Sequence, residues 1–281
     1  MPKVFVPKLT ERTEGIVSLV PKCKSVADIG CDHGYVSIAL VQRGISDRAV
    51  ACDIKEGPLE HAKRNIEKAC LSDRIRTELA PGLEAVDCED AEAIVIAGMG
   101  QRTIAEILSN SADIAKKAKY LVLQPQSEVP EMREYLVTNG YTILKNKLMI
   151  EKDKYYFAIL ASATVSEYGE EKSRVVTGLR ERKSEPEFEM YSKHMDELFG
   201  LDLIYGDKNL AYYLSHVIRE WGDALTNLSE AKKPDFDRIN ELKTKKVCAE
   251  VALELNTLFC GIDDKLKNMM DGGFIRKLNE E

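Results

Sequence analysis

The stretch that decides the fold is Val26-Ala27-Asp28-Ile29-Gly30-Cys31-Asp32-His33-Gly34-Tyr35. A second acid, Asp53, stands at the end of the next apolar run. A β-branched strand ends at an acid and a glycine, a tight loop follows, and an amphipathic helix begins at Tyr35. This order is typical of the first strand, loop and helix of a doubly wound α/β sheet, where a nucleotide-like ligand lies over the strand's carboxyl end. Asp53 stands at about the spacing where an acid binds ribose hydroxyls.

The same alternation of apolar runs and amphipathic segments continues to about residue 163. The pattern predicts a lead-in helix over 9–20 with Thr10 as its N-cap, and strands over 25–29, 49–52, 75–79, 93–97, 120–123, 141–150 and 154–163. It predicts helices over 34–43, 56–69, 100–108 and 128–139. Because the last two strands are separated only by a short turn, we expect a seven-stranded sheet that closes with an antiparallel hairpin.

The chain changes character after this sheet, so we predict two domains, 1–164 and 165–281. Residues 168–172 have the composition of a linker. Apolar residues then recur at helical spacing in two long segments, at Leu210, Tyr213, Leu214, Val217, Ile218, Trp221, Leu225 and Leu228, and at Ile239, Leu242, Val247, Val251, Leu255 and Leu258. Two amphipathic helices around a short turn predict an antiparallel, coiled-coil-like helical hairpin.

Composition narrows the class of protein. The 281 residues carry a net charge of −7, mostly after Val165, which argues against attraction of nucleic acid over the whole surface but allows a local basic patch.

No apolar run is long enough to span a bilayer, and the first residues lack the apolar core of a secretory signal. The seven cysteines form no C-x-x-C pair, which indicates reduced thiols rather than disulfides or zinc. We expect a cytoplasmic protein without membrane or metal partners, and the sequence leaves monomer and oligomer open.

Candidate ligand-binding residues gather where the predicted strands end. Carboxyl ends of parallel strands meet at one edge of a sheet, and glycines there allow close approach of a ligand to the backbone. The candidates for binding the cofactor are Asp28, Gly30, Cys31, Asp32, Gly34, Asp53, Ile54, Gly82, Leu83, Ala97, Gly98 and Met99.

Several of these motifs resemble a known family. The loop D-x-G-x-D-H-G is similar to the acid-x-G-x-G-x-G signature of class I S-adenosylmethionine (SAM) methyltransferases, with Asp32 in place of the middle glycine. Together with Ile96-Ala97-Gly98-Met99-Gly100, Leu123-Gln124-Pro125 and Asn139-Gly140-Tyr141, it resembles the TrmK family of bacterial tRNA adenine-N1 methyltransferases, which act on position 22 of tRNA. The resemblance covers the whole sheet domain and extends more weakly to residues 210–221 of the helical domain.

The resemblance implies a Rossmann-like methyltransferase sheet, SAM as cofactor, tRNA as partner, and a helical domain that helps to position the tRNA. The sequence departs from the family at Cys31, where Ser or Thr is common, at Pro81, where a small polar residue is usual, and at Gln101 and Gln126. A backbone N–H of Gly82 or Leu83 would then replace the side chain that contacts the SAM adenine.

The expected reaction requires that the SAM methyl group and adenine N1 be positioned in line and shielded from water, and that a carboxylate lie nearby. Adenine N1 gains positive charge on methylation, so Asp32 is the candidate that stabilises the developing cation. His33 is a candidate for shaping the pocket, and Gln124 and Gln126 are amides placed to contact the edge of the adenine. Because N1 lies on the pairing edge, the target base must be unpaired or turned out of its stack.

Three alternatives remain open. A class I SAM methyltransferase with another acceptor needs the same residues. A nicotinamide-dependent oxidoreductase is disfavoured, because the glycine pattern is incomplete and Asp32 would repel a pyrophosphate. A non-catalytic Rossmann-like scaffold or RNA-binding module would use the same fold without methyl transfer.

Overall fold

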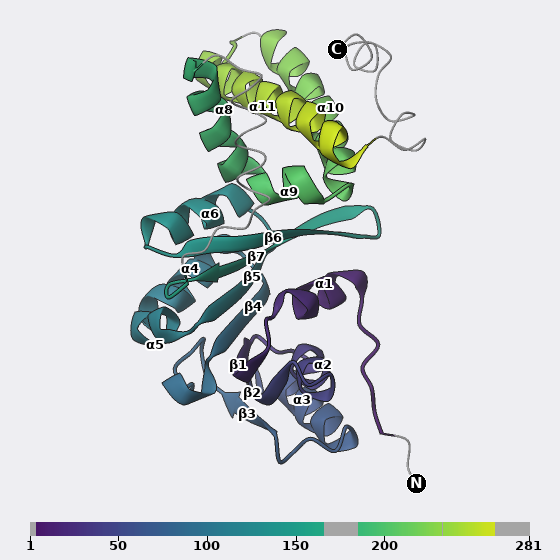
Figure 1. Ribbon diagram of the computed structural model, residues 1–281, viewed down its shortest axis with the longest axis vertical. Coiled ribbons are helices and arrows are strands. Elements are labelled where there is room, and N and C mark those ends of the chain that lie inside the picture. Colours follow the sequence, from purple (N-terminus) through teal and green to yellow (C-terminus); the bar gives the residue numbers. More distant parts are fainter. Residues whose placement is uncertain (1–3, 166–184, 232, 262–281) are drawn as a thin grey trace. The chain divides into compact units, whose positions relative to one another are not determined.

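The computed structural model describes residues 4–165, 185–231 and 233–261. The chain divides into two compact units, residues 1–167 and 168–281. The first unit is an α/β sheet domain (Figure 1). Its elements are α1 (Glu11–Leu19), β1 (Cys23–Ile29), α2 (Tyr35–Gln42), β2 (Ser46–Asp53), α3 (Glu56–Lys68), β3 (Ile75–Leu79), η1 (Cys88–Asp90), β4 (Ala93–Met99), α4 (Gln101–Asn110), α5 (Ala112–Lys117), β5 (Tyr120–Pro125), α6 (Val129–Thr138), β6 (Thr142–Glu151) and β7 (Lys154–Ser162).

The predicted doubly wound sheet of seven strands is confirmed. The strand order is β3-β2-β1-β4-β5-β7-β6, in which β1 to β5 are parallel to one another and β7 runs antiparallel to both β5 and β6. The chain moves outward from β1 to β3, then returns to the other side of β1 with β4. The topological switch point therefore lies between β1 and β4, which is where such sheets bind ligands.

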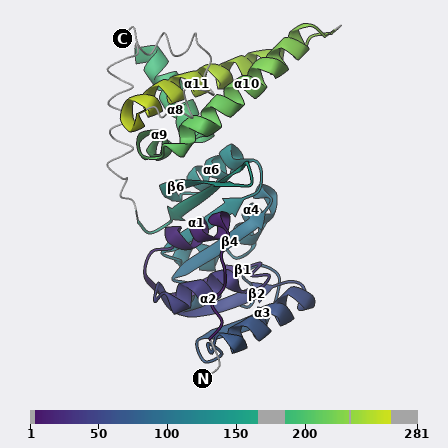
Figure 2. The same ribbon diagram turned by 90° about the vertical axis from the view of Figure 1, so that its right-hand side faces the viewer.

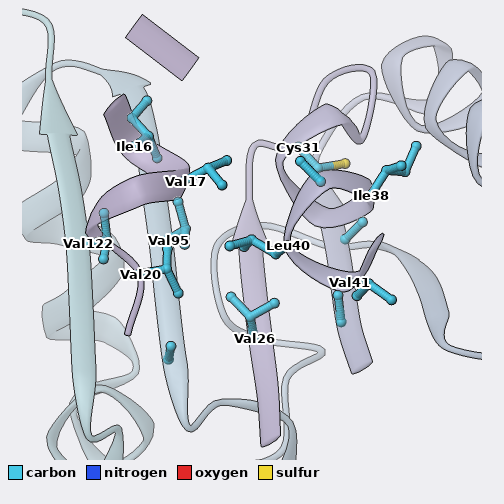
Figure 3. Close-up of a cluster of buried hydrophobic side chains, with 14 of the residues drawn as sticks. Ile16, Val17, Val20, Val26, Cys31, Ile38, Leu40, Val41, Val95 and Val122 are labelled. Atoms are coloured by element: carbon cyan, nitrogen blue, oxygen red, sulfur yellow. The ribbon is translucent and has the colours of Figure 1, made fainter. Parts of the chain in front are cut away.

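One face of the sheet is covered by α1, α2 and α3, which appear on the right of the sheet in Figure 1. In the close-up of Figure 3, Ile16 and Val17 of α1 lie over Val95 and Val122, and Leu40 of α2 lies beside Val26. The opposite face packs Ile94, Ile96, Leu121 and Leu123 against α4, α5 and α6. Because side chains alternate along each strand, both faces of the central strands are buried and their sequences are almost entirely apolar.

The elements expected from the sequence are all present in the first unit, with Thr10 as the N-cap of α1, where its hydroxyl accepts from the Thr13 N–H. The structure differs from the prediction at the polar start of β2 and in two short helices. β2 begins at Ser46 rather than at residue 49, because its first residues pair with β1 although they are polar. The short helices η1 and α5 were not predicted, since neither is long enough to show a helical period.

The second unit contains α8 (Glu185–Leu198), α9 (Leu201–Gly206), α10 (Asn209–Ser229) and α11 (Phe236–Cys260). The predicted hairpin is formed by α10 and α11, which run side by side in Figure 2. Of the α11 residues in the apolar pattern, Ile239, Leu242, Val251 and Leu255 are buried, whereas Val247 and Leu258 are 39% and 56% exposed. Cys248 and Thr257 are also buried, because α11 packs on α8 and α9 as well as on α10, which widens its buried face.

Asn256 lies at the junction of α9 and α11 in this unit. Its side-chain N–H groups donate to the carbonyls of Ile204 and Asp207, at 2.8 and 3.1 Å, which satisfies the end of α9. The predicted linker at 168–172 lies outside the described residues. Among the helices that the structure describes, none has the length and apolar character needed to cross a membrane.

Candidate functional site

A cavity of about 530 Å³ opens at the carboxyl ends of β1, β2 and β4, at the switch point of the sheet. Its volume is that of pockets that hold small molecules and cofactors. The lining residues are Ile29, Gly30, Asp32, Asp53, Ile54, Lys55, Pro58, Ala80, Pro81, Gly82, Leu83, Glu84, Ala97, Gly98, Met99, Thr103, Glu106, Ile107, Asn110 and Ser111.

The loop after β1 forms one wall and has a left-handed backbone at three positions. Gly30 and Gly34 have φ of +73° and +70°, and Asp32, in the place of the family's middle glycine, has φ of +48°. The N–H groups of Gly30 and Cys31 both donate to the Cys52 carbonyl, at 2.8 and 3.0 Å, which ties the loop to β2. A Cβ on Gly30 would lie 2.3 Å from Cε of Met99, so this glycine lets the Met99 side chain lie against the loop.

Asp28 lies beneath the loop and is 4% exposed. Its Oδ2 accepts from the hydroxyl and the backbone N–H of Ser37, at 2.7 and 3.2 Å. Burial raises the pKa of Asp28 from 3.8 to about 6, while the bonds from Ser37 act against this rise and the charge of Asp53 adds to it. The carboxylate of Asp28 therefore fastens the first turn of α2 to the end of β1 rather than forming part of the cavity wall.

Asp53 does line the cavity, at the end of β2. Its Oδ2 accepts from the Asp32 N–H at 3.3 Å, and its Oδ1 accepts from the Lys55 N–H at 2.9 Å. Each carboxylate oxygen can accept more than one hydrogen bond, so the group keeps capacity for two hydroxyl donors. The same carboxylate can thus order two loops and bind a diol.

The opposite wall comes from α4 and from the loop after β3. Thr103, Glu106, Ile107 and Asn110 share one face of α4, at i, i+3, i+4 and i+7, and Ile107 packs on Gly82 at a position where a Cβ would lie 3.1 Å away. The sequence analysis missed these α4 residues. The available signal was that α4 starts directly after the glycines that end β4, so its outward face must border the switch point.

The predicted cofactor residues fall into two groups. Those that line the cavity are Gly30, Asp32, Asp53, Ile54, Gly82, Leu83, Ala97, Gly98 and Met99. The second group is buried behind the cavity wall and consists of Asp28, Cys31 and Gly34. At Gly34 a Cβ would lie 3.2 Å from Cβ of Ala62 in α3. These three residues shape the loop and do not form part of the wall that the described residues build.

The predicted catalytic residues are also divided. Asp32 lies on the cavity wall with its side chain 67% exposed, and His33 Nε2 is 3.7 Å from its Oδ2, on the outer side of the loop. Gln124 is fully buried and donates to the Pro125 carbonyl at 2.8 Å, so its side chain supports the turn after β5. Gln126 is exposed, and its Nε2 would lie 3.8 Å from a Cβ on Gly98, at the edge of the cavity.

The charges on the wall favour a cationic ligand. Four carboxyl groups line the cavity, those of Asp32, Asp53, Glu84 and Glu106, against the single lysine Lys55. A pyrophosphate would meet repulsion here, whereas SAM, with a sulfonium and an ammonium against one carboxylate, would meet attraction. Within the described part of the chain, no group of three His, Cys, Asp or Glu residues is arranged to hold a metal ion.

Comparisons with known proteins agree with this site. A family model described as "Methyltransferase domain" matches residues 9–159. The chain is 34% identical to the tRNA (adenine(22)-N(1))-methyltransferase of Bacillus subtilis (strain 168) over 156 residues, which are 56% of this chain and 66%, just under two thirds, of that relative.

Two solved structures are similar over more of the chain. The crystal structure of the B. subtilis m1A22 tRNA methyltransferase TrmK matches with a TM-score of 0.70 and 25% identity, and the match covers 88% of this chain and 99% of that one. The structure of M. capricolum TrmK in complex with S-adenosyl-homocysteine matches with a TM-score of 0.67 and 26% identity, and covers 88% of this chain and 98% of that one.

Proposed function

The chain belongs to the methyltransferase-domain family. From this premise, and from its similarity to the TrmK enzymes, we propose that it transfers the methyl group of SAM to N1 of adenine 22 in tRNA. The observation that carries the proposal is the cavity at the switch point, with Asp53 at the end of β2 and carboxylates on its wall. SAM bound there would supply a methyl group made electrophilic by its sulfonium sulfur.

The residues on the wall fit the parts of SAM. Asp53 has free acceptor capacity for the two ribose hydroxyls. The adenine would lie between the apolar side chains of the exposed Ile54 and of Ile107. The backbone at Gly82 and Leu83 borders the same part of the cavity. The loop at Gly30 borders the remaining part of the cavity, where the methionine tail of SAM would lie.

The chemical step needs no general base. The N1 lone pair of the adenine forms the new N–C bond while the electron pair of the S–C bond goes to sulfur, so that the positive charge passes to the adenine ring and S-adenosylhomocysteine leaves. Asp32, which lies on the wall and is well exposed, would stabilise this charge. Gln126 would contact the edge of the base from the rim, while the buried Gln124 supports the turn after β5 and His33 lies beside Asp32.

The substrate tRNA is the partner that this function requires, and we propose that the helical unit formed by α8 to α11 helps to position it. A tRNA substrate and seven free thiols support a cytoplasmic location. The target base has to leave its stack to reach a cavity at the strand ends.

The test is transfer of labelled methyl from SAM to unmodified tRNA transcripts that differ only at position 22, with adenine in one and guanine in the other. Label on the adenine transcript alone is the expected result. No label on either, with SAM binding intact, would contradict the proposed acceptor and favour another substrate. No binding of SAM would contradict the whole proposal and favour a scaffold.

A further inference from the structure

Four rings form a continuous row on the surface beside the cavity. Phe5 contacts Tyr35 with 6.2 Å between ring centroids, Tyr35 stacks on His33 at 5.3 Å and 23°, and His33 meets the edge of His61 at 5.3 Å and 74°. These rings come from the N-terminal segment, the start of α2, the loop after β1 and the middle of α3. None of them belongs to the wall that the described residues form around the cavity.

The row is held in place by backbone contacts. The Phe5 N–H donates to the Lys68 carbonyl at 3.0 Å, and Gln42 Nε2 donates to the Phe5 carbonyl at 2.8 Å. Asn65 Nδ2 donates to the His33 carbonyl at 3.0 Å, which joins α3 to the loop. The backbone at Phe5 and at His33 is therefore fixed, which lowers the cost of ordering this part of the row when a ligand binds beside it.

The third ring of the row lies next to the cavity, and the fourth is exposed to solvent. The third ring is His33, whose Nε2 lies 3.7 Å from the Asp32 carboxylate on the cavity wall. The fourth ring is His61, which is exposed and whose Nδ1 lies 3.3 Å from Nη2 of the exposed Arg64. The packing of the N-terminal segment accounts for Phe5 and Tyr35, but it does not involve His61. A half-exposed imidazole and an exposed one, with a guanidinium beside them, offer flat faces and positive charge.

We propose that the exposed ring of His61, which meets His33 edge to face, is a stacking platform for a nucleotide next to the target adenine, so that one flanking base of the tRNA lies on this ring while the target base enters the cavity. This inference rests on the proposed function. A base that leaves its stack exposes the faces of its neighbours, and single-stranded bases stack on aromatic side chains and on arginine. A ring that meets His33, beside Asp32 of the cavity wall, is placed to accept such a neighbour.

His61 is the residue to test, because it lies outside the cavity wall. His61→Ala should raise the Kd for the tRNA about 5- to 10-fold, the lower part of the range for loss of one stacked base, with the Kd for SAM unchanged. His61→Phe should restore most of the affinity, since it keeps a flat ring. Ser72→Ala, an exposed neutral change beyond the end of α3, is the matched control and should bind as the wild type does.

A double-mutant cycle identifies the contact. Wild type and His61→Ala are titrated with full transcripts and with transcripts that lack the base at position 21 or at position 23. If the platform holds a flanking base, removing that base should weaken the wild type but hardly weaken His61→Ala, at one of the two positions. Additive losses at both positions, or a His61→Phe variant as weak as His61→Ala, would overturn the platform. Methyl transfer is measured in the same samples. If the wild type methylates no transcript, both the proposed function and the platform are overturned, whereas normal methylation with additive losses overturns the platform alone.

Discussion

Ser37 Oγ donates a 2.7 Å hydrogen bond to Asp28 Oδ2 in a place where both residues are buried. The bond joins the end of β1 to the first turn of α2, so it fixes the loop between them, which carries Gly30 and Asp32 to the cavity. Asp28, the first acid of the family motif, therefore affects the cavity only by fixing the loop that borders it.

Ser37→Ala should destabilise the fold. The change removes the hydroxyl donor and leaves a buried carboxylate with the Ser37 backbone N–H alone, which is expected to cost about 1–3 kcal/mol in the free energy of unfolding. Urea denaturation measures it, with Ser18→Ala as control, because the exposed Ser18 only donates to the Gly15 carbonyl of its own helix. Equal losses in the two variants would contradict a special role for the Asp28–Ser37 bond.

The raised pKa of Asp28 predicts a pH dependence of stability. An acid whose pKa rises on folding holds its proton more tightly in the folded state, so its stabilisation is present below its ordinary pKa of 3.8 and is lost as the pH rises through about 6. Relative to Asp28→Asn, the wild type should therefore lose on the order of 3 kcal/mol between pH 4 and pH 7.5. Chemical denaturation of both proteins across this range tests it, and a constant difference would contradict the raised pKa.

Asp53→Ala should weaken SAM binding at least about tenfold, since hydrogen bonds to a charged group contribute roughly 1.5–3 kcal/mol. It also removes the acceptor for the N–H groups of Asp32 and Lys55. Calorimetric titration with SAM measures the change. Asp73→Ala removes an exposed acid outside the cavity wall and should bind SAM normally. An unchanged Kd in Asp53→Ala would exclude Asp53 from the site.

Gly30→Ala should lower SAM affinity, and Gly44→Ala should not. Both glycines have left-handed φ values, +73° and +65°, so each change should cost about 1–2 kcal/mol of stability. They differ in surroundings, because a Cβ on Gly30 meets Met99 and one on Gly44 meets no described atom within 4 Å. Met99 can move, but it lines the cavity, so its displacement changes the site. Equal SAM affinity in the two variants would contradict this account.

Asp32→Gly should raise stability and lower activity. The left-handed φ of +48° strains an aspartate by about 1 kcal/mol, which glycine relieves, whereas methyl transfer loses its carboxylate. Lys152→Gly is the control, since Lys152 has φ of +50° in the exposed turn between β6 and β7. Denaturation and single-turnover methyl transfer should show stabilisation in both variants and slower transfer in Asp32→Gly alone. Normal transfer in Asp32→Gly would remove Asp32 from the catalytic step.

The sheet could be predicted from the sequence because its central strands are buried on both faces. Runs such as Ala93–Ala97 admit few other structures, and the glycines and acids at their ends mark the ligand edge. The division of the motif residues into wall and support could not be predicted. Whether an acid points into a cavity or beneath a loop depends on a single partner such as Ser37, and spacing alone does not reveal that partner.

The α4 wall and the wide buried face of α11 could not be predicted for a similar reason. Exposed polar residues such as Glu106 and Asn110 carry no apolar period, so their position on the cavity follows only from the path of the chain after β4. Three helices, α8, α9 and α10, contact α11, so its buried face is wider than a two-helix pattern predicts, and Val247 and Leu258 still lie outside it.

The described wall of the cavity begins at Ile29 and ends at Ser111, whereas β5 and β7, which complete the sheet beside β4, follow later in the chain. During translation, every side chain of that wall leaves the ribosome before the strands that cover the free edge of β4. A nascent chain of this length would hold the whole binding surface on an unfinished sheet. Because every residue of this wall precedes β5, a cofactor bound to it would stabilise the first four strands before the sheet is complete.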